Sequence, residues 1–460
     1  MIADLKPYPA YKESGSPWLG AVPDNWEARN LRTLISKRTE RDQADLPLLS
    51  VAREKGVFIR SLTDADENHN VIPEDLSNYK VARAGNLVIN KMKAWQGSMG
   101  VAPCDGIVSP AYFVFDLQID NRAFGQRLLR SRPYVAHFAQ ASDGVRVGQW
   151  DLSIPGMRQI PVLVPPPSEQ AAIVRFLDWA NGRLERAIRA KRKVIALLNE
   201  QKQVIIHRAV TRGLDPSFPL KPSGVPWLGD IPQHWEVRKL KHLTRFVNGL
   251  PFKPGDWKAT GVPIIRIQNL NGSEAFNYTD RSGLPEELLI QPGDLMFAWS
   301  GNRGTSFGSF EWTRQYPGYL NQHIFKLVGY ALPKRYFYYL LRAVTRHVEE
   351  QAGGIIGLVH VTKPELGSVY VPIAPQDEAR AIAREMDGAT TEIERAVSRL
   401  EREIELLREY RTRLVADVVT GKLDVLEAAA RLPDEVTAET VAHDIDLGDE
   451  SEIADDEIAV

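Results

Sequence analysis

The sequence is poor in cysteine and in long apolar stretches. Cys104 is the only cysteine among 460 residues, which excludes a disulfide framework and a cysteine-rich zinc site and suits a reducing compartment. No stretch approaches the roughly eighteen consecutive apolar residues of a membrane span. Residues 1–12 have neither a basic start with an apolar run nor a cleavage signal. These absences predict a soluble, cytoplasmic protein with no membrane partner.

Motifs that carry catalysis are also missing. The chain has no Gly-x-x-x-x-Gly-Lys-Ser/Thr phosphate loop, no Asp/Asn-Pro-Pro-Tyr/Phe adenine-methylation motif and no glycine-rich turn for S-adenosylmethionine. Residues 215–218 (Asp-Pro-Ser-Phe) come near the second motif, but they lie in a linker where a turn is favoured. The nine histidines form no His-x-x-x-His pair, so no metal site is expected. An enzyme with an unrecognised active site is an alternative, but Asp256 and Lys258 alone are too few residues to indicate one.

Charge is unevenly distributed along the chain. The net charge is −2, but residues 432–460 contain eleven Asp and Glu and no Lys or Arg. The preceding 431 residues therefore carry nine more basic than acidic side chains. This balance predicts a basic folded body that permits a polyanionic partner, followed by a solvated, disordered acidic tail.

Two long stretches of the chain are copies of one another. Residues 168–215 match residues 377–424 at an offset of 209, without a gap. Apolar residues in each recur at steps of four and three, which predicts a coiled-coil seam on a helix of about 45 residues, roughly 65 Å long. Such a helix, present twice, most simply packs against its own copy; an ordinary core helix in each half is the alternative. The predicted seam comprises Ile173, Leu177, Ala180, Leu184, Ala187, Val194, Leu198 and Ile205, interrupted by Lys191 and Gln201, and Ile382, Met386, Ala389, Ile393, Ala396, Leu400, Ile404, Leu407, Tyr410 and Leu414.

Helix starts and stops agree between the copies. Each stretch follows a proline-rich approach, where Ser168 or Asp377 can cap the first turn, and Gly213 and Gly421 sit where the helices would end. The same offset of 209 relates two lead-in segments, residues 15–27 and 224–236. The chain is thus two tandem repeats, each a globular part followed by a long helix.

The globular parts alternate strand-like runs with Gly, Pro and Asn. In the first, residues 46–51, 56–59, 86–90 and 107–117 read as strands and 124–140 as a helix. In the second, residues 262–267, 293–298 and 319–328 read as strands and 334–351 as a helix. We therefore predict an α+β fold with two mixed α/β domains.

Glycine-rich segments identify a family. Residues 85–100 (Gly-Asn-Leu-Val-Ile-Asn-Lys-Met-Lys-Ala-Trp-Gln-Gly-Ser-Met-Gly), followed by 106–112, resemble the target-recognition domain of type I restriction-modification specificity subunits. Residues 293–304 are the counterpart in the second half, and Pro-x-x-Glu-Gln-x-x-Ile at 166–173 also resembles that family. The resemblance covers residues 10–425, and the order domain, helix, domain, helix is its most specific feature.

The resemblance implies a division of labour within a complex. Each domain would read one half of a split DNA site, while the helices would pair antiparallel, set the gap and dock modification subunits, two of them, alongside restriction subunits. Adenine-N6 methylation and ATP-dependent cleavage, with S-adenosylmethionine, ATP and Mg²⁺, would belong to those partners. The implied division of the chain is 1–165 (first recognition domain), 166–213 (first helix), 214–374 (second recognition domain), 375–425 (second helix) and 426–460 (tail).

Candidate contacts to double-stranded DNA follow from side-chain chemistry. Lys and Arg suit phosphates, whereas forked or amide side chains suit base edges. We expect Gln96 to contact an adenine and Arg303 a guanine, although an exposed cation in a loop is more often simply solvated. The candidates are Lys91, Lys93, Gln96, Arg146 and Gln149 in the first domain, and Ser300, Asn302, Arg303, His323 and Lys363 in the second.

A bivalent coiled-coil adaptor is the competing interpretation. Its two domains would bind protein or peptide, and it would show no salt-dependent affinity for DNA.

Overall fold

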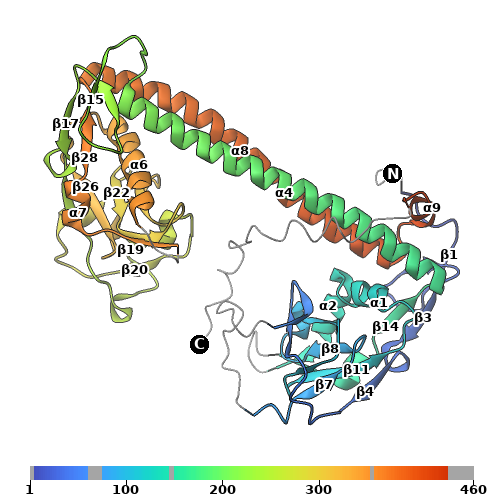
Figure 1. Ribbon diagram of the computed structural model, residues 1–460. Coiled ribbons are helices and arrows are strands. Elements are labelled where there is room, and N and C mark those ends of the chain that lie inside the picture. The colour runs from blue at the N-terminus through green and yellow to red at the C-terminus, as the bar shows by residue number, and fades with distance from the viewer. Residues whose placement is uncertain (1–4, 61–74, 145–149, 353–356, 434–460) are drawn as a thin grey trace. The chain divides into compact units, whose positions relative to one another are not determined.

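The computed structural model describes residues 5–60, 75–144, 150–352 and 357–433. The chain forms two compact units, Met1–Ala190 with Glu403–Val460, and Lys191–Arg402, and Figure 1 labels several elements of each. This division cuts across both long helices, whereas the sequence-based division follows helix ends and stays a prediction. Among the described residues, no helix is long and apolar enough to cross a membrane.

The first unit combines short strands with helices. Its strands are β1 (Tyr11–Glu13), β2 (Ala21–Pro23), β3 (Glu27–Asn30), β4 (Ile35–Arg38), β5 (Leu49–Ala52), β6 (Gly56–Ile59), β7 (Lys80–Ala82), β8 (Leu87–Asn90), β9 (Met99–Val101), β10 (Gly106–Val108), β11 (Tyr112–Leu117), β12 (Ser142–Asp143), β13 (Asp151–Leu152) and β14 (Pro161–Val164). Its own helices are α1 (Arg122–Leu129), α2 (Arg132–Gln140), α3 (Ile154–Arg158) and α9 (Leu426–Ala430).

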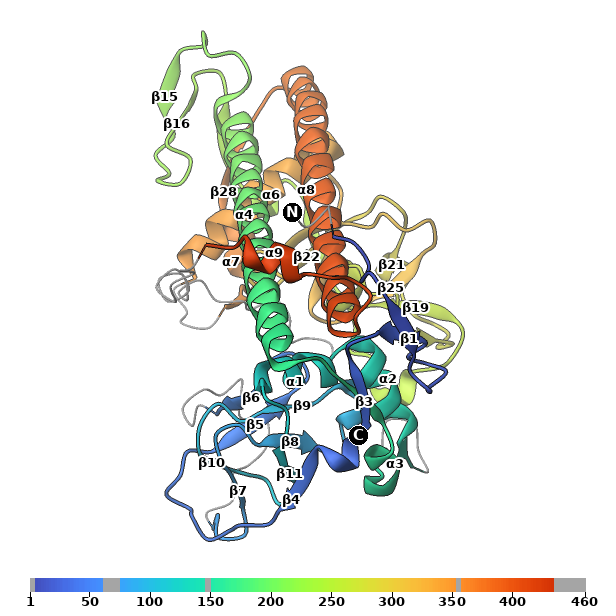
Figure 2. The same cartoon turned by 90° about the vertical axis from the view of Figure 1, so that its right-hand side faces the viewer.

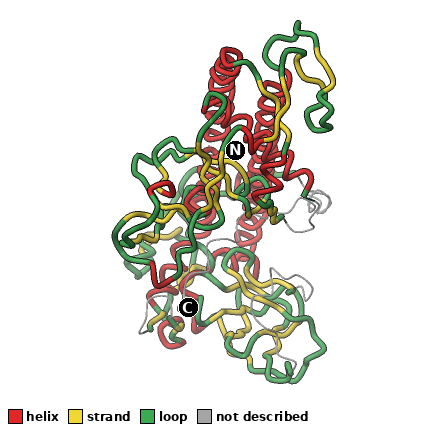
Figure 3. Tube along the Cα trace, turned by 90° about the vertical axis from the view of Figure 1, so that its left-hand side faces the viewer, coloured by secondary structure: helices red, strands yellow, loops and turns green. Residues whose placement is uncertain are grey.

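The second unit has the same kinds of element. Its strands are β15 (Leu220–Pro222), β16 (Asp230–Pro232), β17 (Glu236–Lys239), β18 (Arg245–Asn248), β19 (Val262–Ile265), β20 (Asn277–Thr279), β21 (Leu289–Ile290), β22 (Leu295–Ala298), β23 (Ser300–Asn302), β24 (Gly308–Glu311), β25 (Gly318–Leu320), β26 (Ile324–Val328), β27 (Leu358–His360) and β28 (Tyr370–Ile373). Its helices are α5 (Ile267–Leu270), α6 (Lys334–Gln351) and α7 (Lys363–Ser368). Figure 3 shows the mixture of helix and strand, which confirms the predicted α+β class.

Matching strand pairs demonstrate the repeat. A four-stranded antiparallel sheet has the order β4-β11-β8-β9 in the first unit and β18-β26-β22-β24 in the second. The pairs β1–β2 and β15–β16 have identical registers at the offset of 209, and so do β3–β14 and β17–β28. The second unit adds a sheet of order β20-β19-β25-β21. The two domains therefore share these paired strands and differ in the segments that connect them.

Two long helices, α4 (Pro167–Arg212) and α8 (Gln376–Val419), run through both units (Figure 2). In the first unit the start of α4 packs with the end of α8, and in the second the end of α4 packs with the start of α8. The helices are therefore antiparallel within each unit. Lys202 Nζ lies 3.4 Å from Glu394 Oε1, and Glu185 pairs with Arg411 at the equivalent positions of the other unit.

Most predicted seam positions are covered. Ile173, Leu177, Leu184 and Ile382 are buried, and Leu198, Ile393, Leu400 and Leu407 are partly buried. Two predicted seam residues are wrong, because Val194 is 44% and Tyr410 41% exposed. The seam shifts along α4, where buried Ile188 and Ile206 take over, since a straight helix of 3.6 residues per turn drifts away from a strict heptad.

The helix starts also differ from expectation. Ser168 and Asp377 lie inside the first turn rather than at the cap. The carbonyl of Pro166 accepts the amides of Glu169 and Gln170, and that of Pro375 accepts the amide of Ala379. Pro167 suits the first helical position because it lacks an N–H that would go unpaired there. Gly213 and Gly421 end the helices in the left-handed conformation, at φ +73° and +75°, as predicted.

A glutamate in the first turn of each long helix ties each domain to that helix. Glu169, in the first turn of α4, accepts hydrogen bonds from Trp26 Nε1 (2.8 Å), Asn25 Nδ2 (2.9 Å) and Tyr8 Oη. Burial, followed by the hydrogen bond to Glu169, raises the pKa of Tyr8. These contacts fix the first lead-in segment against α4.

The second repeat makes a sparser version of this anchor. Glu378 Oε2 accepts from Trp235 Nε1 (3.0 Å) and His234 Nε2 (2.8 Å), while its buried Oε1 has no partner among the described residues. Asp178 and Asp387, again equivalent, receive Arg127 from α1 and Arg335 from α6. The same two carboxylate positions thus fasten both domains.

Four sequence predictions need correction at element boundaries. The helix expected over 124–140 is broken into α1 and α2, because Pro133 starts a new helix. The strand expected over 107–117 is two strands, as is that over 319–328, with turns between them. The tail was expected from residue 426, but α9 folds back onto the first core, burying Ala429 and Leu432. The acidic residues beyond 433 lie outside the described residues.

Candidate nucleic-acid interface

A fixed tryptophan organises one surface of the second unit. Trp299 joins β22 to β23, and its ring stacks on Phe325 with 5.9 Å between centroids and 23° between planes. His360 meets the ring edge-on at 4.9 Å, and His323 lies at 5.1 Å. Trp299 Nε1 donates to the carbonyl of Gln322 at 3.0 Å. The indole therefore holds three separate chain segments together.

Polar side chains surround this indole. The pairing of β23 with β27 places Ser300 opposite His360. Gln322 Nε2 lies 3.0 Å from His323 Nε2, and both residues are exposed, as are Asn302 and His360, whereas Ser300 is partly buried. We call Ser300, Asn302, Gln322, His323 and His360 the polar loop surface. Amide and imidazole groups on a rigid support can read base edges, so Ser300, Asn302 and His323 stay predictions for DNA contact.

Two members of this surface escaped the sequence analysis. Gln322 adjoins His323 and was overlooked beside it. His360 is brought in by a pairing with Ser300 that spans 60 residues, for which the sequence carries no local signal.

Arg303 and Lys363 sit differently from the other predicted residues. Arg303 Nη2 donates to the carbonyls of Glu349 (2.7 Å) and Ala352 (2.8 Å), where α6 ends. This position favours a helix-capping role over a guanine contact. Lys363 is exposed at the first position of α7, beside its capping residue Thr362. Contacts of both residues with DNA remain predictions.

The first unit presents a different set of groups. Trp95 lies in the short helix Ala94–Gln96, donates from Nε1 to the carbonyl of Met92 (3.1 Å) and meets Trp150 edge-on at 5.2 Å. Lys91 Nζ pairs with Asp151 Oδ2 at 2.8 Å, whereas Lys93 is exposed and Gln96 partly buried. Arg146 and Gln149 lie outside the described residues. Lys93 and Gln96 are thus the predicted contacts that this structure leaves most available.

A group of cations in the first unit was also missed. Lys80 Nζ donates to the carbonyl of Tyr112 at 2.6 Å. Burial lowers the pKa of Lys80, and the positive charges of Arg41, Lys37 and Lys91 lower it further. Four cations from three segments therefore gather here, which suits phosphate. Among the described residues, no three His, Cys, Asp or Glu side chains are placed to hold a metal ion.

Comparison with known proteins finds similar chains among the type I restriction specificity subunits. A model described as "Type I restriction modification DNA specificity domain" matches residues 232–405. The EcoBI specificity subunit of Escherichia coli is 26% identical over 198 residues, 42% of this chain and 40% of that protein. The MjaVIII specificity subunit of Methanocaldococcus jannaschii is 26% identical over 282 residues, 58% of this chain and 63% of that protein. Residues 232–405 therefore carry a type I restriction modification DNA specificity domain, and the chain is similar to type I restriction specificity subunits.

The matched region spans less than two thirds of the length of both relatives. The fold has a solved counterpart in a chain from a study of complex assembly and conformational transition of the type I R-M system. That chain has a TM-score of 0.60 at 15% identity, with 87% of this chain and 99% of that chain covered. Its likeness concerns the fold alone.

Proposed function

We propose that this specificity subunit directs a type I restriction-modification complex to a split DNA site, with one half-site read by each recognition domain. The repeated scaffold carries the proposal. Equivalent sheets support an aromatic platform in each unit, Trp95 in the first and Trp299 in the second, yet the polar groups around the two platforms differ. Two similar domains with different contact chemistry suit a site whose halves differ in sequence.

Helices α4 and α8 would set the unspecified gap and dock the partner subunits. Half-sites on one face of a duplex lie about one helical turn, or roughly 10 base pairs, apart. Apolar residues are left exposed on α4, namely Val194, Leu197 (55%) and Val204, and on α8, namely Leu406 (64%) and Tyr410. Leu197 and Leu406 are equivalent at the offset of 209, which suits the docking of one modification subunit at each. The restriction subunits would complete the assembly.

Partner subunits would carry the chemistry. In this proposal the modification subunits bind S-adenosylmethionine and methylate adenine N6. The restriction subunits use ATP and Mg²⁺ for cleavage. Nothing in the specificity subunit takes part beyond positioning the DNA.

Adenine methylation across a host genome tests the function. We expect a split motif with a fixed gap in cells that hold this chain with its native modification subunit, and no such motif in cells lacking the chain. Exchange of residues 214–374 for the equivalent domain of another family member should change one half of the motif and leave the other. An unchanged methylation pattern beside a stable complex would instead support the adaptor interpretation.

Docking is tested separately. Leu197→Lys and Leu406→Lys should each weaken co-purification of the modification subunit, because each places a charge in an apolar contact. Glu409→Lys, at an exposed position of α8, is the matched control. If both leucine variants retained full stoichiometry, docking would have to lie elsewhere.

A further inference from the structure

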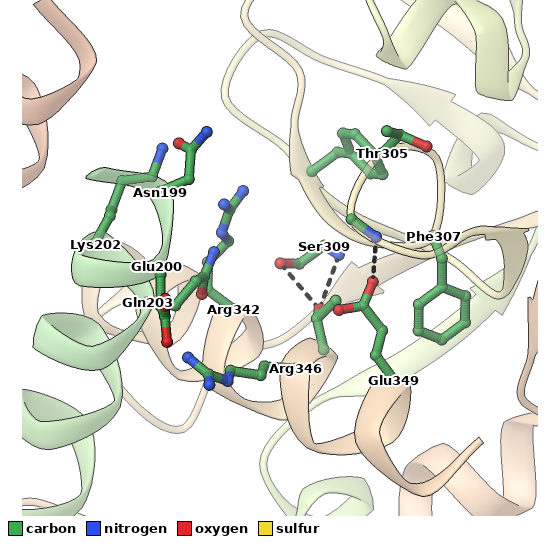
Figure 4. A pocket seen from close by; sticks show the side chains of 13 residues that line it. Asn199, Glu200, Lys202, Gln203, Thr305, Phe307, Ser309, Arg342, Arg346 and Glu349 are labelled. Atoms are coloured by element: carbon green, nitrogen blue, oxygen red, sulfur yellow. Dashed lines mark hydrogen bonds between the residues drawn. The ribbon is translucent and has the colours of Figure 1, made fainter. Parts of the chain in front are cut away.

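A polar cavity lies between α4 and α6 in the second unit. Its volume is 520 Å³, within the range of small-molecule sites. Figure 4 shows Arg342 and Arg346 extending from α6 into the space that faces α4, from which Asn199 and Gln203 project. The segment from Gly304 to Phe310, which follows the polar loop surface along the chain, closes a third side.

Arg342 stands out among the cations of this cavity. Lys202 lies 3.4 Å from Glu394, and Arg346 Nε lies 2.8 Å from Glu350. Arg342 is partly buried and forms no hydrogen bond or ion pair with any described residue. A guanidinium with no carboxylate within ion-pair distance is well suited to phosphate, which its planar fork can bind through two hydrogen bonds.

Two acidic residues, Glu349 and Glu200, also line the cavity. Glu349 Oε1 accepts the amide of Gly304 at 2.7 Å, and burial raises the pKa of Glu349 despite that bond and the nearby Arg303 and Arg342. Glu200 is exposed on α4. Asn199 and Gln203 add amide donors to the same side.

The cavity wall is rigid where it meets the polar loop surface. Gly304 adopts φ +75°, and Arg303 and Gly304 both bond to the last turn of α6. At the cavity's inner side, Ser309 is buried and its amide donates to Thr345 Oγ1 at 3.2 Å. The amides of Ser306 and Phe307 donate to the carbonyl of Asn302 at 3.1 Å, so this wall of the cavity is tied to the strand that carries Asn302.

We propose that this cavity holds a backbone phosphate of the DNA through Arg342, with Arg346, Asn199 and Gln203 as supporting donors, next to the half-site read by the second domain. This inference rests on the proposed DNA-binding function. The contact would position the duplex without selecting its sequence, because phosphates carry no base identity. The cavity volume admits a phosphodiester together with its adjoining sugars.

The test measures DNA binding by the complete complex with its modification subunits. Fluorescence anisotropy would follow a duplex with the methylated split site and a scrambled duplex between 50 and 200 mM salt. For Arg342→Gln we expect the slope of log affinity against log salt to fall by about 1, with equal weakening on both duplexes, of about three- to tenfold. Arg342→Lys keeps the charge and should keep the slope. Arg384→Gln, an exposed position on α8, is the control for charge loss.

Several outcomes would overturn the inference. The first is an unchanged salt slope for Arg342→Gln. The second is a loss of affinity confined to the split-site duplex, and the third is an equal loss of affinity in Arg384→Gln. Titration with inorganic phosphate at constant ionic strength separates the sources of the anion. Phosphate binding that Arg342→Gln abolishes while DNA binding stays intact would mean a small-anion site instead. If the wild-type complex failed to prefer the split site, the proposed function would fail, whereas the scrambled duplex would still report the Arg342 contact.

Discussion

The two glutamate anchors should differ in strength. Glu169→Ala removes the acceptor of three donors, of which Trp26 Nε1 and Tyr8 Oη belong to buried residues and Asn25 is exposed. A buried donor left unpaired costs about 1–3 kcal/mol, while an exposed one finds water. Two such donors predict a loss of about 3 kcal/mol in the first unit.

Glu378→Ala is the matched comparison. It leaves one buried donor, Trp235 Nε1, since His234 is exposed. It also removes the unpaired buried oxygen Oε1. The predicted loss is about half as large, roughly 1.5 kcal/mol or less. The interaction of a carboxylate with the helix N-terminus is lost in both variants and cancels between them.

Native-state hydrogen exchange is the suitable assay, because it resolves local opening within a chain of several cooperative parts. Amides in the first turns of α4 and α8 would be followed in the same sample. A loss of 3 kcal/mol corresponds to roughly a 150-fold faster exchange in α4 of Glu169→Ala, against roughly tenfold in α8 of Glu378→Ala. Equal acceleration in the two helices, or a larger one in α8, would refute the reasoning.

Three further predictions concern stability. Gly421→Ala should lower the free energy of unfolding in urea clearly more than Gly20→Ala does. Both glycines have a positive φ, which costs an alanine about 1 kcal/mol, but only at Gly421 would the added Cβ also lie 2.5 Å from Pro23 Cδ. Equal losses in the two variants would contradict this prediction. His347 stacks on Trp227 at 4.8 Å, and burial lowers the pKa of His347, an effect that Glu350 opposes and His207 strengthens. The native state therefore binds fewer protons than the unfolded state, so the stability present above about pH 6.5 should be lost as the pH falls. In His347→Phe, the free energy of unfolding measured over a pH series should depend less on pH. Glu185→Lys should destabilise the helix pair by less than about 1 kcal/mol, because both partners are well exposed, and adding Arg411→Glu should restore it in thermal melts.

The sequence predicted the elements that repeat. Duplication at one offset and a seam of steps of four and three depend on local periodicity, so α4, α8 and their glycine ends could be placed from residues alone. The shift of the seam from Val194 to Ile188 and Ile206 could not, because it follows from how two particular helices drift along each other.

The candidate site was predictable only where it is local. Ser300 and Asn302 lie in one glycine-rich segment, whereas His360 joins them through a strand pairing across the domain. Arginine is a residue type that often contacts bases, but the guanidinium of Arg303 donates to carbonyls at the end of α6. No sequence pattern indicates that contact. Gln170 is similar: it accepts the amide of Asn121 at 2.9 Å and donates to the carbonyl of Pro165 at 2.8 Å, a role absent from its equivalent Ala379.

The core of the first unit has a consequence for synthesis on the ribosome. It is completed by Leu414, Val418, Val419 and Val425, from the far end of the chain, and Asp424 N donates to the carbonyl of Lys6 at 2.8 Å. Lys191–Arg402 form the other unit without such late residues. Residues of the first unit before 190 must therefore wait, with part of their apolar surface uncovered, until residues 414–425 have been translated. The second unit can close before the first, which reverses the usual order of domain folding during synthesis.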